Sequence, residues 1–205
     1  MRSASDLRRA AYYRLFSADG YLAGLAETDS LLDVGCADGR GSEALSRRRA
    51  DGVDIYRPAL ETARGNGRRT RVVQADVRSL PYRDASYDVV IALDVVEHFT
   101  KPDALAVMAD LERVARRLVV IATPRGFLPQ PGTPDEPWQE HRCGFEAAEL
   151  ETSGYQVKAL GGPKWLRGSY GSFRAGPLGQ LAVVLTKPIV PPSAAFALLA
   201  AKRVA

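Results

Sequence analysis

The stretch LLDVGCADGRG, residues 31 to 41, is the part of the sequence that decides the predicted fold. An apolar run of strand length ends at Val34, and small residues follow it, with glycines at positions 35, 39 and 41. Glycine permits backbone conformations and close approaches that a Cβ atom would block. We therefore expect a strand, a tight turn and the start of a helix, with a ligand touching the backbone of the turn. A tight turn without a ligand is the alternative.

The rest of the chain repeats this alternation of strand and helix. With 205 residues, 46% of them hydrophobic and 25% charged, it has the size and composition of one globular domain. Apolar runs alternate with helix-period segments, which predicts an α/β fold built on a parallel sheet. The predicted strands are Ser30–Val34, Gly52–Ile55, Arg71–Ala75, Tyr87–Leu93, Leu118–Thr123, Tyr155–Leu160 and Ala195–Arg203. The predicted helices are Arg40–Arg48, Arg57–Arg64, Pro102–Arg116 and Phe145–Ser153.

Three segments of the single predicted domain, residues 1–205, lie outside this alternation. Residues 1–28 are predicted to contain an amphipathic N-terminal helix. Residues 124–144 are rich in proline and show no periodicity, and a loop of that length inside a compact domain is usually an active-site lid or a binding loop. Residues 163–194 are predicted to be a C-terminal insertion that precedes the last strand.

The charged residues and cysteines narrow the class of protein. The net charge of +4 comes mostly from scattered arginines, with clusters such as residues 68–71. We interpret these as solvated faces; a surface for an acidic substrate or a nucleic acid is the alternative. Cys36 and Cys143 stand far apart without CxxC spacing, so the sequence supports neither a disulfide framework nor a structural zinc site. A reducing, cytoplasmic setting fits best.

The apolar stretch 178–201 is the part of the sequence that most resembles a membrane segment. Lys187 and three prolines interrupt it, which leaves no run of the roughly 18 apolar residues needed to cross a bilayer. The sequence therefore predicts no transmembrane segment. A core helix and a core strand are the favoured interpretation, and peripheral membrane contact is the alternative.

Acidic residues stand at the ends of three successive predicted strands. Asp33 ends the first, Asp54 the second and Asp76 the third. An acid about twenty residues after the first glycine is where a carboxylate accepts hydrogen bonds from ribose hydroxyls; helix capping is the alternative for Asp54 and Asp76. Ala37 stands where the GxGxxG dinucleotide motif requires glycine, and carboxylates beside the turn suit a cationic ligand better than a pyrophosphate.

These motifs resemble a known family. DVGCADG (33–39), VDI (53–55) and QADVRSLPYRDASYDVVIALDVVEH (74–98) are similar to class I S-adenosylmethionine-dependent methyltransferases of the small-molecule and ubiquinone-biosynthesis-like type. The resemblance runs from about residue 31 to residue 162. It implies a Rossmann-like, doubly wound, three-layer α/β/α fold. Its seven-stranded sheet would have the order 3-2-1-4-5-7-6, with the last strand antiparallel.

The resemblance also implies S-adenosylmethionine as cofactor and assigns roles to residues. The glycine-rich turn would hold the methionine and ribose, Asp54 the ribose hydroxyls, and Asp76 with the Val77 backbone the adenine, while Ile55 and Val77 flank the adenine ring. Ala37 departs from the commoner glycine. The predicted cofactor residues are Asp33, Gly35, Cys36, Ala37, Gly39, Asp54, Ile55, Asp76, Val77, Leu93 and Asp94.

The acceptor side of the site is predicted from the two histidines and their surroundings. His98 and His141 are candidate general bases, because an unperturbed imidazole titrates near pH 6.5. The alternatives are that His98 caps a local turn or packs under the loop, and that His141 anchors the loop. Glu97, Phe127 and Trp138 are predicted to line the acceptor pocket. One histidine and one carboxylate make an incomplete metal set, so no metal is predicted.

The leading functional hypothesis is O-methylation of a small molecule or a carrier-linked sugar. An RNA methyltransferase is the runner-up, although no RNA-binding appendage or stacking motif supports it, so nucleic acid is not an expected partner. A non-catalytic binding module and a dehydrogenase on the same fold are further alternatives. The sequence leaves the oligomeric state open.

Overall fold

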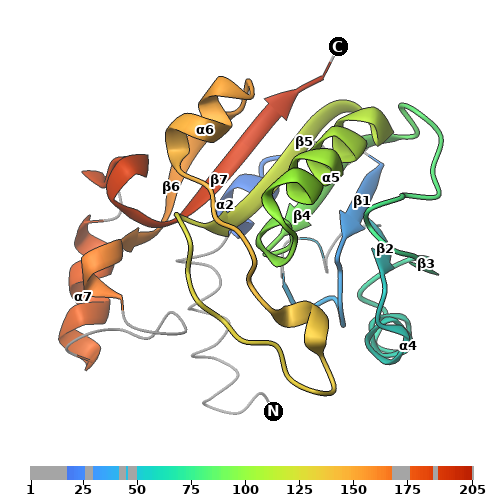
Figure 1. The fold of residues 1–205 in the computed structure, drawn as a ribbon, viewed down its shortest axis with the longest axis horizontal. Helices are drawn as coiled ribbons and strands as arrows, with labels where there is room; N and C mark the ends of the chain where they lie inside the picture. The colour runs from blue at the N-terminus through green and yellow to red at the C-terminus, as the bar shows by residue number, and fades with distance from the viewer. Residues whose placement is uncertain are drawn as a thin grey trace. The chain divides into compact units, whose positions relative to one another are not determined.

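The computed structural model describes residues 18–25, 30–41, 45, 50–167, 176–186 and 189–204. Its seven strands form a sheet in the order β3-β2-β1-β4-β5-β7-β6, and β6 runs antiparallel to β7 (Figure 1). This is the predicted order, so the predicted Rossmann-like α/β fold is confirmed. The strands are β1 (Leu31–Val34), β2 (Ala50–Asp54), β3 (Val72–Gln74), β4 (Tyr87–Leu93), β5 (Ala115–Pro124), β6 (Gln156–Pro163) and β7 (Ala195–Arg203).

The helices follow the predicted pattern, with boundaries that differ by up to two residues. The α-helices are α2 (Asp19–Leu22), α4 (Arg57–Gly65), α5 (Lys101–Val114), α6 (Ala147–Thr152) and α7 (Gly176–Thr186), and the short 3-10 turns are η1 (Val96–His98), η2 (Pro137–Gln139), η3 (Lys164–Leu166) and η6 (Pro192–Ala194). The helix expected to end at Arg116 ends at Val114, because β5 begins directly at Ala115 without an intervening glycine or proline. The predicted helix 40–48 and most of the N-terminal segment 1–28 lie outside the described residues.

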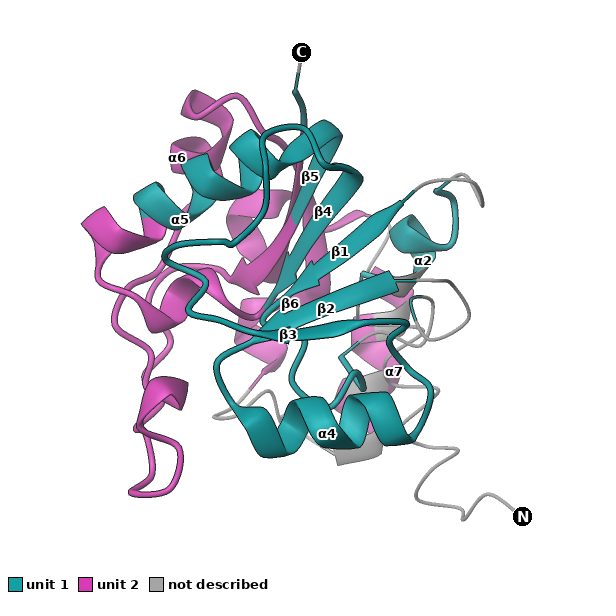
Figure 2. Ribbon diagram, turned by 90° about the vertical axis from the view of Figure 1, so that its right-hand side faces the viewer, with its two compact units in different colours: residues 1–93, 105–120, 203–205 teal, residues 94–104, 121–202 magenta. Residues whose placement is uncertain are grey.

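Contacts divide the chain into two compact units, coloured separately in Figure 2. Unit 1 comprises residues 1–93, 105–120 and 203–205, and unit 2 comprises residues 94–104 and 121–202. The prediction of one domain over residues 1–205 stays a prediction.

Parallel strands align the predicted ligand residues in unit 1. β1 pairs with both β2 and β4, and the register sets Val34 opposite Val53 and Ala92, while Asp54 lies opposite Gln74 of β3. Helix α4 packs against β2 and β3 with Leu60 and Ala63 buried. Since parallel strands end at the same edge, the turn after β1 and the ends of β2, β3 and β4 share one edge of the sheet.

Unit 2 carries the proline-rich loop between β5 and α6. Its two ends meet in a parallel bridge between Arg125 and Phe145, and the Gly126 amide donates to the Phe145 carbonyl at 2.8 Å. Helix α6 begins with a reciprocal capping box between Glu146 and Glu149, which satisfies backbone donors at its first turn. The loop is thus closed at its base and held to an ordered helix start. The function of residues 124–144 as a lid stays a prediction.

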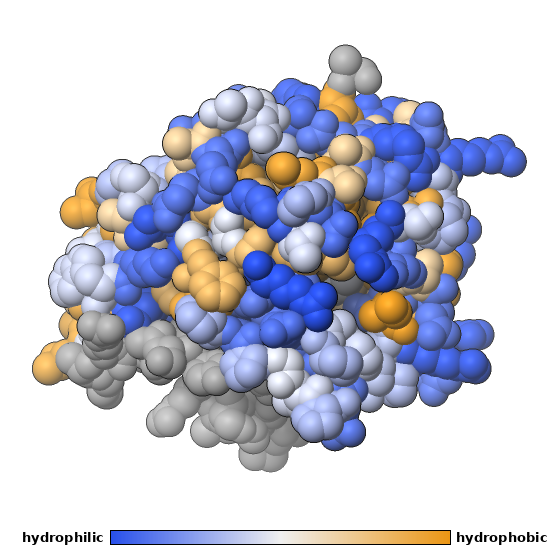
Figure 3. All heavy atoms as spheres, viewed as in Figure 1, coloured by the Kyte–Doolittle hydropathy of each residue, from blue (hydrophilic) through white to orange (hydrophobic). Residues whose placement is uncertain are grey.

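Peripheral membrane contact would require exposed apolar residues on the protein surface. Among the described residues, no helix has the length and apolar character required to cross a bilayer. Helix α7 exposes Leu178, Leu181 and Leu185 while it buries Val183. On the face drawn in Figure 3, hydrophilic side chains predominate and apolar ones form small separate groups. Membrane contact and cytoplasmic location stay predictions.

Candidate functional site

The turn after β1 has the backbone that a ligand-binding turn requires. Gly35, Ala37 and Gly39 have φ angles of 70°, 44° and 78°, in the region where a Cβ atom is disfavoured. Ala37 is held there because its amide donates to Asp54 Oδ2 at 2.8 Å. The Gly35 amide donates to the Val53 carbonyl, also at 2.8 Å. The end of β2 therefore fixes the turn, and Ala37, the departure from the usual glycine, is accommodated by a hydrogen bond.

Asp54 has acceptor capacity left for a ligand. It is only 9% exposed, and its two carboxylate oxygens accept hydrogen bonds from the amides of Ala37 and Tyr56, each at 2.8 Å. An ionised carboxylate has about four acceptor positions, so each oxygen is able to accept one further hydrogen bond. Ile55, the next residue, is 45% exposed although it is apolar. The predicted roles of Asp54 at the ribose and of Ile55 at the adenine stay predictions.

Asp33 has a partner inside the protein that the sequence did not reveal. Arg69 Nε donates to Asp33 Oδ2 at 2.9 Å, and Nη2 of the same guanidinium donates to that oxygen as well. The Arg69 side chain is fully buried, so the prediction of a solvated face at residues 68–71 is wrong for Arg69, whereas the Arg71 side chain is exposed. Burial raises the pKa of Asp33, and the Arg69 charge partly opposes this. Asp33 therefore supports the turn as half of an internal ion pair, and its role toward the cofactor stays a prediction.

Cys36 serves the packing of the turn. Its thiol is buried, and a Cβ atom added at Gly52 of β2 would lie 2.5 Å from Cys36 Sγ. The thiol thus occupies the space that glycine leaves on the neighbouring strand. Burial raises the pKa of Cys36, so the group stays protonated and is a poor nucleophile.

The acid after β3 is held by a neighbour in sequence. Both carboxylate oxygens of Asp76 accept hydrogen bonds from the Arg78 guanidinium, the shortest at 2.5 Å. These hydrogen bonds lower the pKa of Asp76, so its carboxylate stays ionised. Val77 between them is buried, with 7% of its surface exposed. The predicted adenine contacts of Asp76 and Val77, and the predicted contact of Leu93, stay predictions.

A second group of candidate residues lies in unit 2, directly after β4. Asp94 has a φ angle of 53°, and its amide donates to the Ala122 carbonyl at 2.8 Å, which directs the chain into η1. The Asp94 side chain reaches solvent, yet the surrounding protein removes enough hydration to raise its pKa to about 6. Its carboxyl group therefore titrates close to neutral pH.

Glu97 is a buried carboxyl group with one satisfied oxygen. Its Oε2 accepts a hydrogen bond from Thr123 Oγ1 at 3.0 Å, whereas Oε1 is buried and has no hydrogen-bond partner. The residue is 1% exposed, and burial, together with the negative charge of Asp94, raises its pKa well above the ordinary value. The backbone carbonyl of Glu97 accepts from the amides of Arg142 and Cys143 at 2.8 and 3.2 Å, and these bonds tie η1 to the end of the loop.

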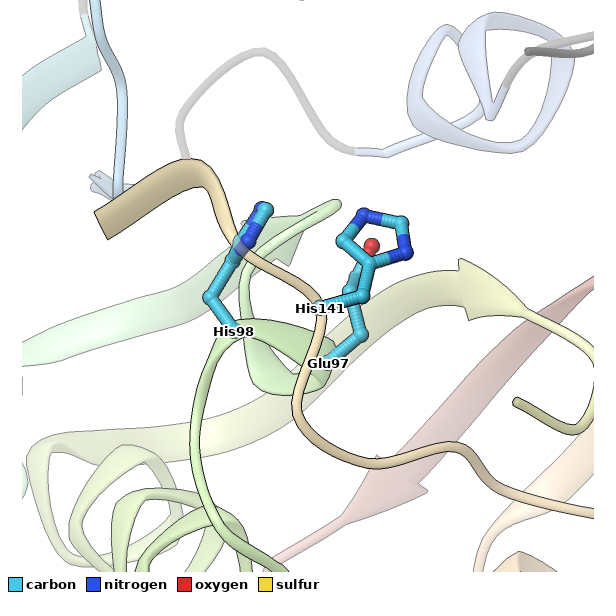
Figure 4. Close-up of side chains that lie close together, drawn as sticks. All are labelled: Glu97, His98 and His141. Atoms are coloured by element: carbon cyan, nitrogen blue, oxygen red, sulfur yellow. The ribbon is translucent and has the colours of Figure 1, made fainter. Parts of the chain in front are cut away.

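The fold brings the two histidines together beside Glu97 (Figure 4). The ring centroids of His98 and His141 lie 4.9 Å apart at an interplanar angle of 68°. His98 Nδ1 lies 3.2 Å from the Glu140 carbonyl, and His141 Nδ1 lies 2.7 Å from the Leu128 carbonyl. Burial is the largest cause that lowers the pKa of both imidazoles, so both are neutral at pH 7. The sequence predicted each histidine as a candidate general base, and no sequence pattern indicated that the two rings lie side by side.

The loop that carries His141 is braced internally. The Gln130 side chain donates to the Gln139 carbonyl at 2.9 Å, and the His141 amide donates to the Gln130 carbonyl at the same distance. Trp138 lies half-buried in η2, and Phe127 is 55% exposed. The loop therefore presents His141 from an ordered backbone, while the acceptor-pocket roles of Phe127 and Trp138 stay predictions.

Comparisons with known proteins agree with this geometry. Residues 32–122 match the methyltransferase-domain family. A "probable S-adenosylmethionine-dependent methyltransferase" of Mycobacterium tuberculosis is 32% identical over 126 residues, which cover 58% of this chain and 44% of that protein. The ubiquinone biosynthesis O-methyltransferase of Acinetobacter baylyi is 31% identical over 100 residues, covering 45% and 42%. A "probable tRNA methyltransferase 9B" of Bos taurus is 32% identical over 85 residues, covering 41% and 18%.

A solved structure supports the fold over nearly the whole chain. Magnesium protoporphyrin IX methyltransferase from Synechocystis PCC 6803, crystallised with bound SAH, superposes with a TM-score of 0.53 at 18% identity, covering 97% of this chain and 81% of that one. The sequence matches span less than half the length of the three curated relatives named above. The family match over residues 32–122, the strand order and the glycine-rich turn together support the predicted resemblance to S-adenosylmethionine-dependent methyltransferases, with S-adenosylmethionine as the cofactor.

Proposed function

We propose that this protein transfers a methyl group from S-adenosylmethionine to a hydroxyl oxygen of a small molecule or a carrier-linked sugar. The observation that carries the proposal is the pair of neutral imidazoles, His98 and His141, beside the buried Glu97. This cluster begins four residues after the end of β4. A hydroxyl acceptor needs a group that takes up its proton, and a neutral imidazole does so near pH 7.

The residues of the chain divide the work of the reaction. When bound, S-adenosylmethionine supplies a methyl group on a sulfonium sulfur, which makes the transfer an in-line displacement. Asp54 and Ile55 would orient the nucleoside, and the turn around Ala37 would face its ribose and methionine parts. The acceptor oxygen forms the new bond to the methyl carbon, and the electron pair of the broken carbon–sulfur bond stays on sulfur. The hydroxyl proton passes to an imidazole of His98 or His141. Positioning the reacting atoms in line supplies much of the acceleration.

The similarity to a "probable tRNA methyltransferase 9B" favours RNA as the second candidate acceptor. Parallel assays with the two classes of acceptor distinguish the two candidate functions. The protein is incubated with S-adenosylmethionine and either a panel of catechols and nucleotide-linked hexoses or total tRNA, and formation of S-adenosylhomocysteine is followed by mass spectrometry. We expect a methyl ether in the small-molecule arm. Products methylated only on nitrogen or carbon, or turnover with tRNA alone, would overturn the proposal.

The histidines are tested in the same assay. His98→Gln and His141→Gln are expected to lower kcat by about 100-fold, the usual contribution of a general base. Asp135→Asn, which changes an exposed carboxylate of the loop that carries His141, is the matched control and is expected to keep full turnover. Full turnover in both histidine variants would remove the histidines from the mechanism.

A further inference from the structure

We propose that Glu97, His98 and His141 form a binding site for one divalent transition-metal ion. The site coincides with the proposed acceptor site, so the role of the ion rests on the proposed function, whereas binding of the ion does not. The sequence argued against a metal because His98 and Glu97 alone are an incomplete set. The fold supplies the third ligand from the far end of the loop, and this completes a set of two imidazoles and one carboxylate.

The candidate ligand atoms of Glu97, His98 and His141 lie close together. Each of the three side chains offers one ligand atom, and these atoms lie within 4.8 Å of one another (Figure 4). Ligands about 2.1 Å from a shared ion lie roughly 3 to 3.5 Å apart. The ligand atoms therefore have to move closer together by less than about 2 Å to share one ion.

The two histidine rings make the same kind of contact through Nδ1. In both, Nδ1 faces a backbone carbonyl, that of Glu140 for His98 and that of Leu128 for His141. A carbonyl only accepts hydrogen bonds, so this contact favours the tautomer with its proton on Nδ1 and its lone pair on Nε2. Metal-bound histidines have this arrangement: the outer nitrogen donates to a carbonyl or carboxylate and the other nitrogen binds the ion.

Glu97 has one carboxylate oxygen, Oε1, that lacks a hydrogen-bond partner. Oε1 is buried without a hydrogen-bond partner, while Thr123 holds Oε2. A buried acceptor without a partner destabilises the folded protein, and the cost is larger when the acceptor is charged. A cation beside Oε1 removes this penalty and stabilises the ionised carboxylate. The neighbouring carboxyl group of Asp94 adds negative charge to the same region.

The donor set points to the class of ion. Imidazole nitrogen suits zinc, iron, nickel and copper, whereas magnesium and calcium prefer sites made of oxygen ligands. Three protein ligands leave at least one coordination position open, as in catalytic zinc sites. A hydroxyl bound at that position has a lower pKa and loses its proton to water, and its oxygen then attacks the methyl carbon as described above. With the ion bound, both histidines are ligands and water takes up the hydroxyl proton; without the ion, a neutral imidazole takes it up.

Titration of the protein with Co²⁺ tests the site directly. Protein without an affinity tag is treated with a chelator, dialysed and titrated with Co²⁺, whose visible absorption bands report nitrogen and oxygen ligands. Zn²⁺ is then added as competitor. We expect one equivalent of Co²⁺ to bind and Zn²⁺ to displace it. His141→Gln and His98→Gln should each weaken binding by at least about tenfold. Asp135→Asn should bind like the wild type, because Asp135 is an exposed residue of the same loop and lies outside the ligand set.

Two results overturn the metal site: a folded wild-type protein that gives no cobalt spectrum, or equal Co²⁺ affinity in wild type and His141→Gln. Circular dichroism of each variant shows whether it is folded, and His98→Gln replaces His141→Gln if the loop variant is not. Metal binding with a nitrogen-methylated product would refute the proposed function and leave the metal site standing. O-methylation that persists in the presence of chelator would refute the role of the ion in the reaction and leave the proposed function standing.

Discussion

Asp54 is the residue whose replacement tests the cofactor site most directly. In Asp54→Ala, the amides of Ala37 and Tyr56 lose their acceptor, which lies 2.8 Å from each. A buried donor left unpaired costs about 1 to 3 kcal/mol. Asp54 is 9% exposed, close enough to solvent for water to replace part of the loss. We therefore expect the free energy of unfolding to fall by about 2 to 3 kcal/mol.

The same substitution is expected to weaken cofactor binding. Two hydrogen bonds from ribose hydroxyls to a carboxylate contribute about 1.5 kcal/mol each, or about 3 kcal/mol together. This corresponds to roughly a 100-fold increase in Kd, since 1.4 kcal/mol is a factor of ten. Relaxation of Ala37 from its φ of 44° would add to the loss, because the turn would no longer be held to β2. The measurement is calorimetric titration with S-adenosylhomocysteine.

Two further variants make the result interpretable. Asp38→Asn changes another acid of the same turn, whose Oδ1 accepts from the Arg40 amide and keeps an acceptor oxygen in the amide form. We expect its Kd within about twofold of the wild type, as for most surface substitutions. Asp54→Asn retains one acceptor oxygen and should lie between wild type and Asp54→Ala in stability. A folded Asp54→Ala that binds S-adenosylhomocysteine within about threefold of the wild type would refute the ribose assignment.

Three other substitutions probe the supports of the site. Arg69→Met leaves the buried Asp33 without its ion-pair partner and should lower the free energy of unfolding in urea by about 3 kcal/mol, while a loss under about 1 kcal/mol would show that the pair is not stabilising. Gly144→Ala should release the base of the loop, because its Cβ would lie 2.3 Å from the backbone of the facing segment, and faster proteolysis within residues 124–144 would report this; an unchanged cleavage rate would contradict it. Burial lowers the pKa of His98 and His141 in the folded protein. Below about pH 6.5 the unfolded chain therefore binds more protons than the folded protein, and the stability that these histidines contribute is lost as the pH falls. Nearby carboxyl groups with raised pKa values change the stability in the opposite direction. The contribution of the histidines is therefore measured as the difference in the free energy of unfolding between the wild type and the variant with both histidines changed to glutamine. Identical pH profiles of the two proteins would contradict the prediction.

The relation between sequence and site differs between the two units. In unit 1, the strand ends and the turn are contiguous in sequence, and their acids were found from spacing alone. Arg69 was misjudged, because an arginine within a basic cluster gives no local sign that it is buried. The pairing of β1 with β2, and of β2 with β3, which follows Arg69 in the chain, brings Arg69 to Asp33.

The sequence by itself determined the α/β class, the boundaries of most strands and, by resemblance, the strand order and the cofactor. It did so because hydrophobic period, turn glycines and strand-end acids are properties of neighbouring residues. Tertiary structure alone decided that His141 joins Glu97 and His98, and that one carboxylate oxygen lacks a partner. The path of residues 125–146 sets that meeting. It depends on the bridge from Arg125 to Phe145 and on the bonds of the Glu97 carbonyl to Arg142 and Cys143, contacts between residues too far apart in the chain for any local pattern to encode.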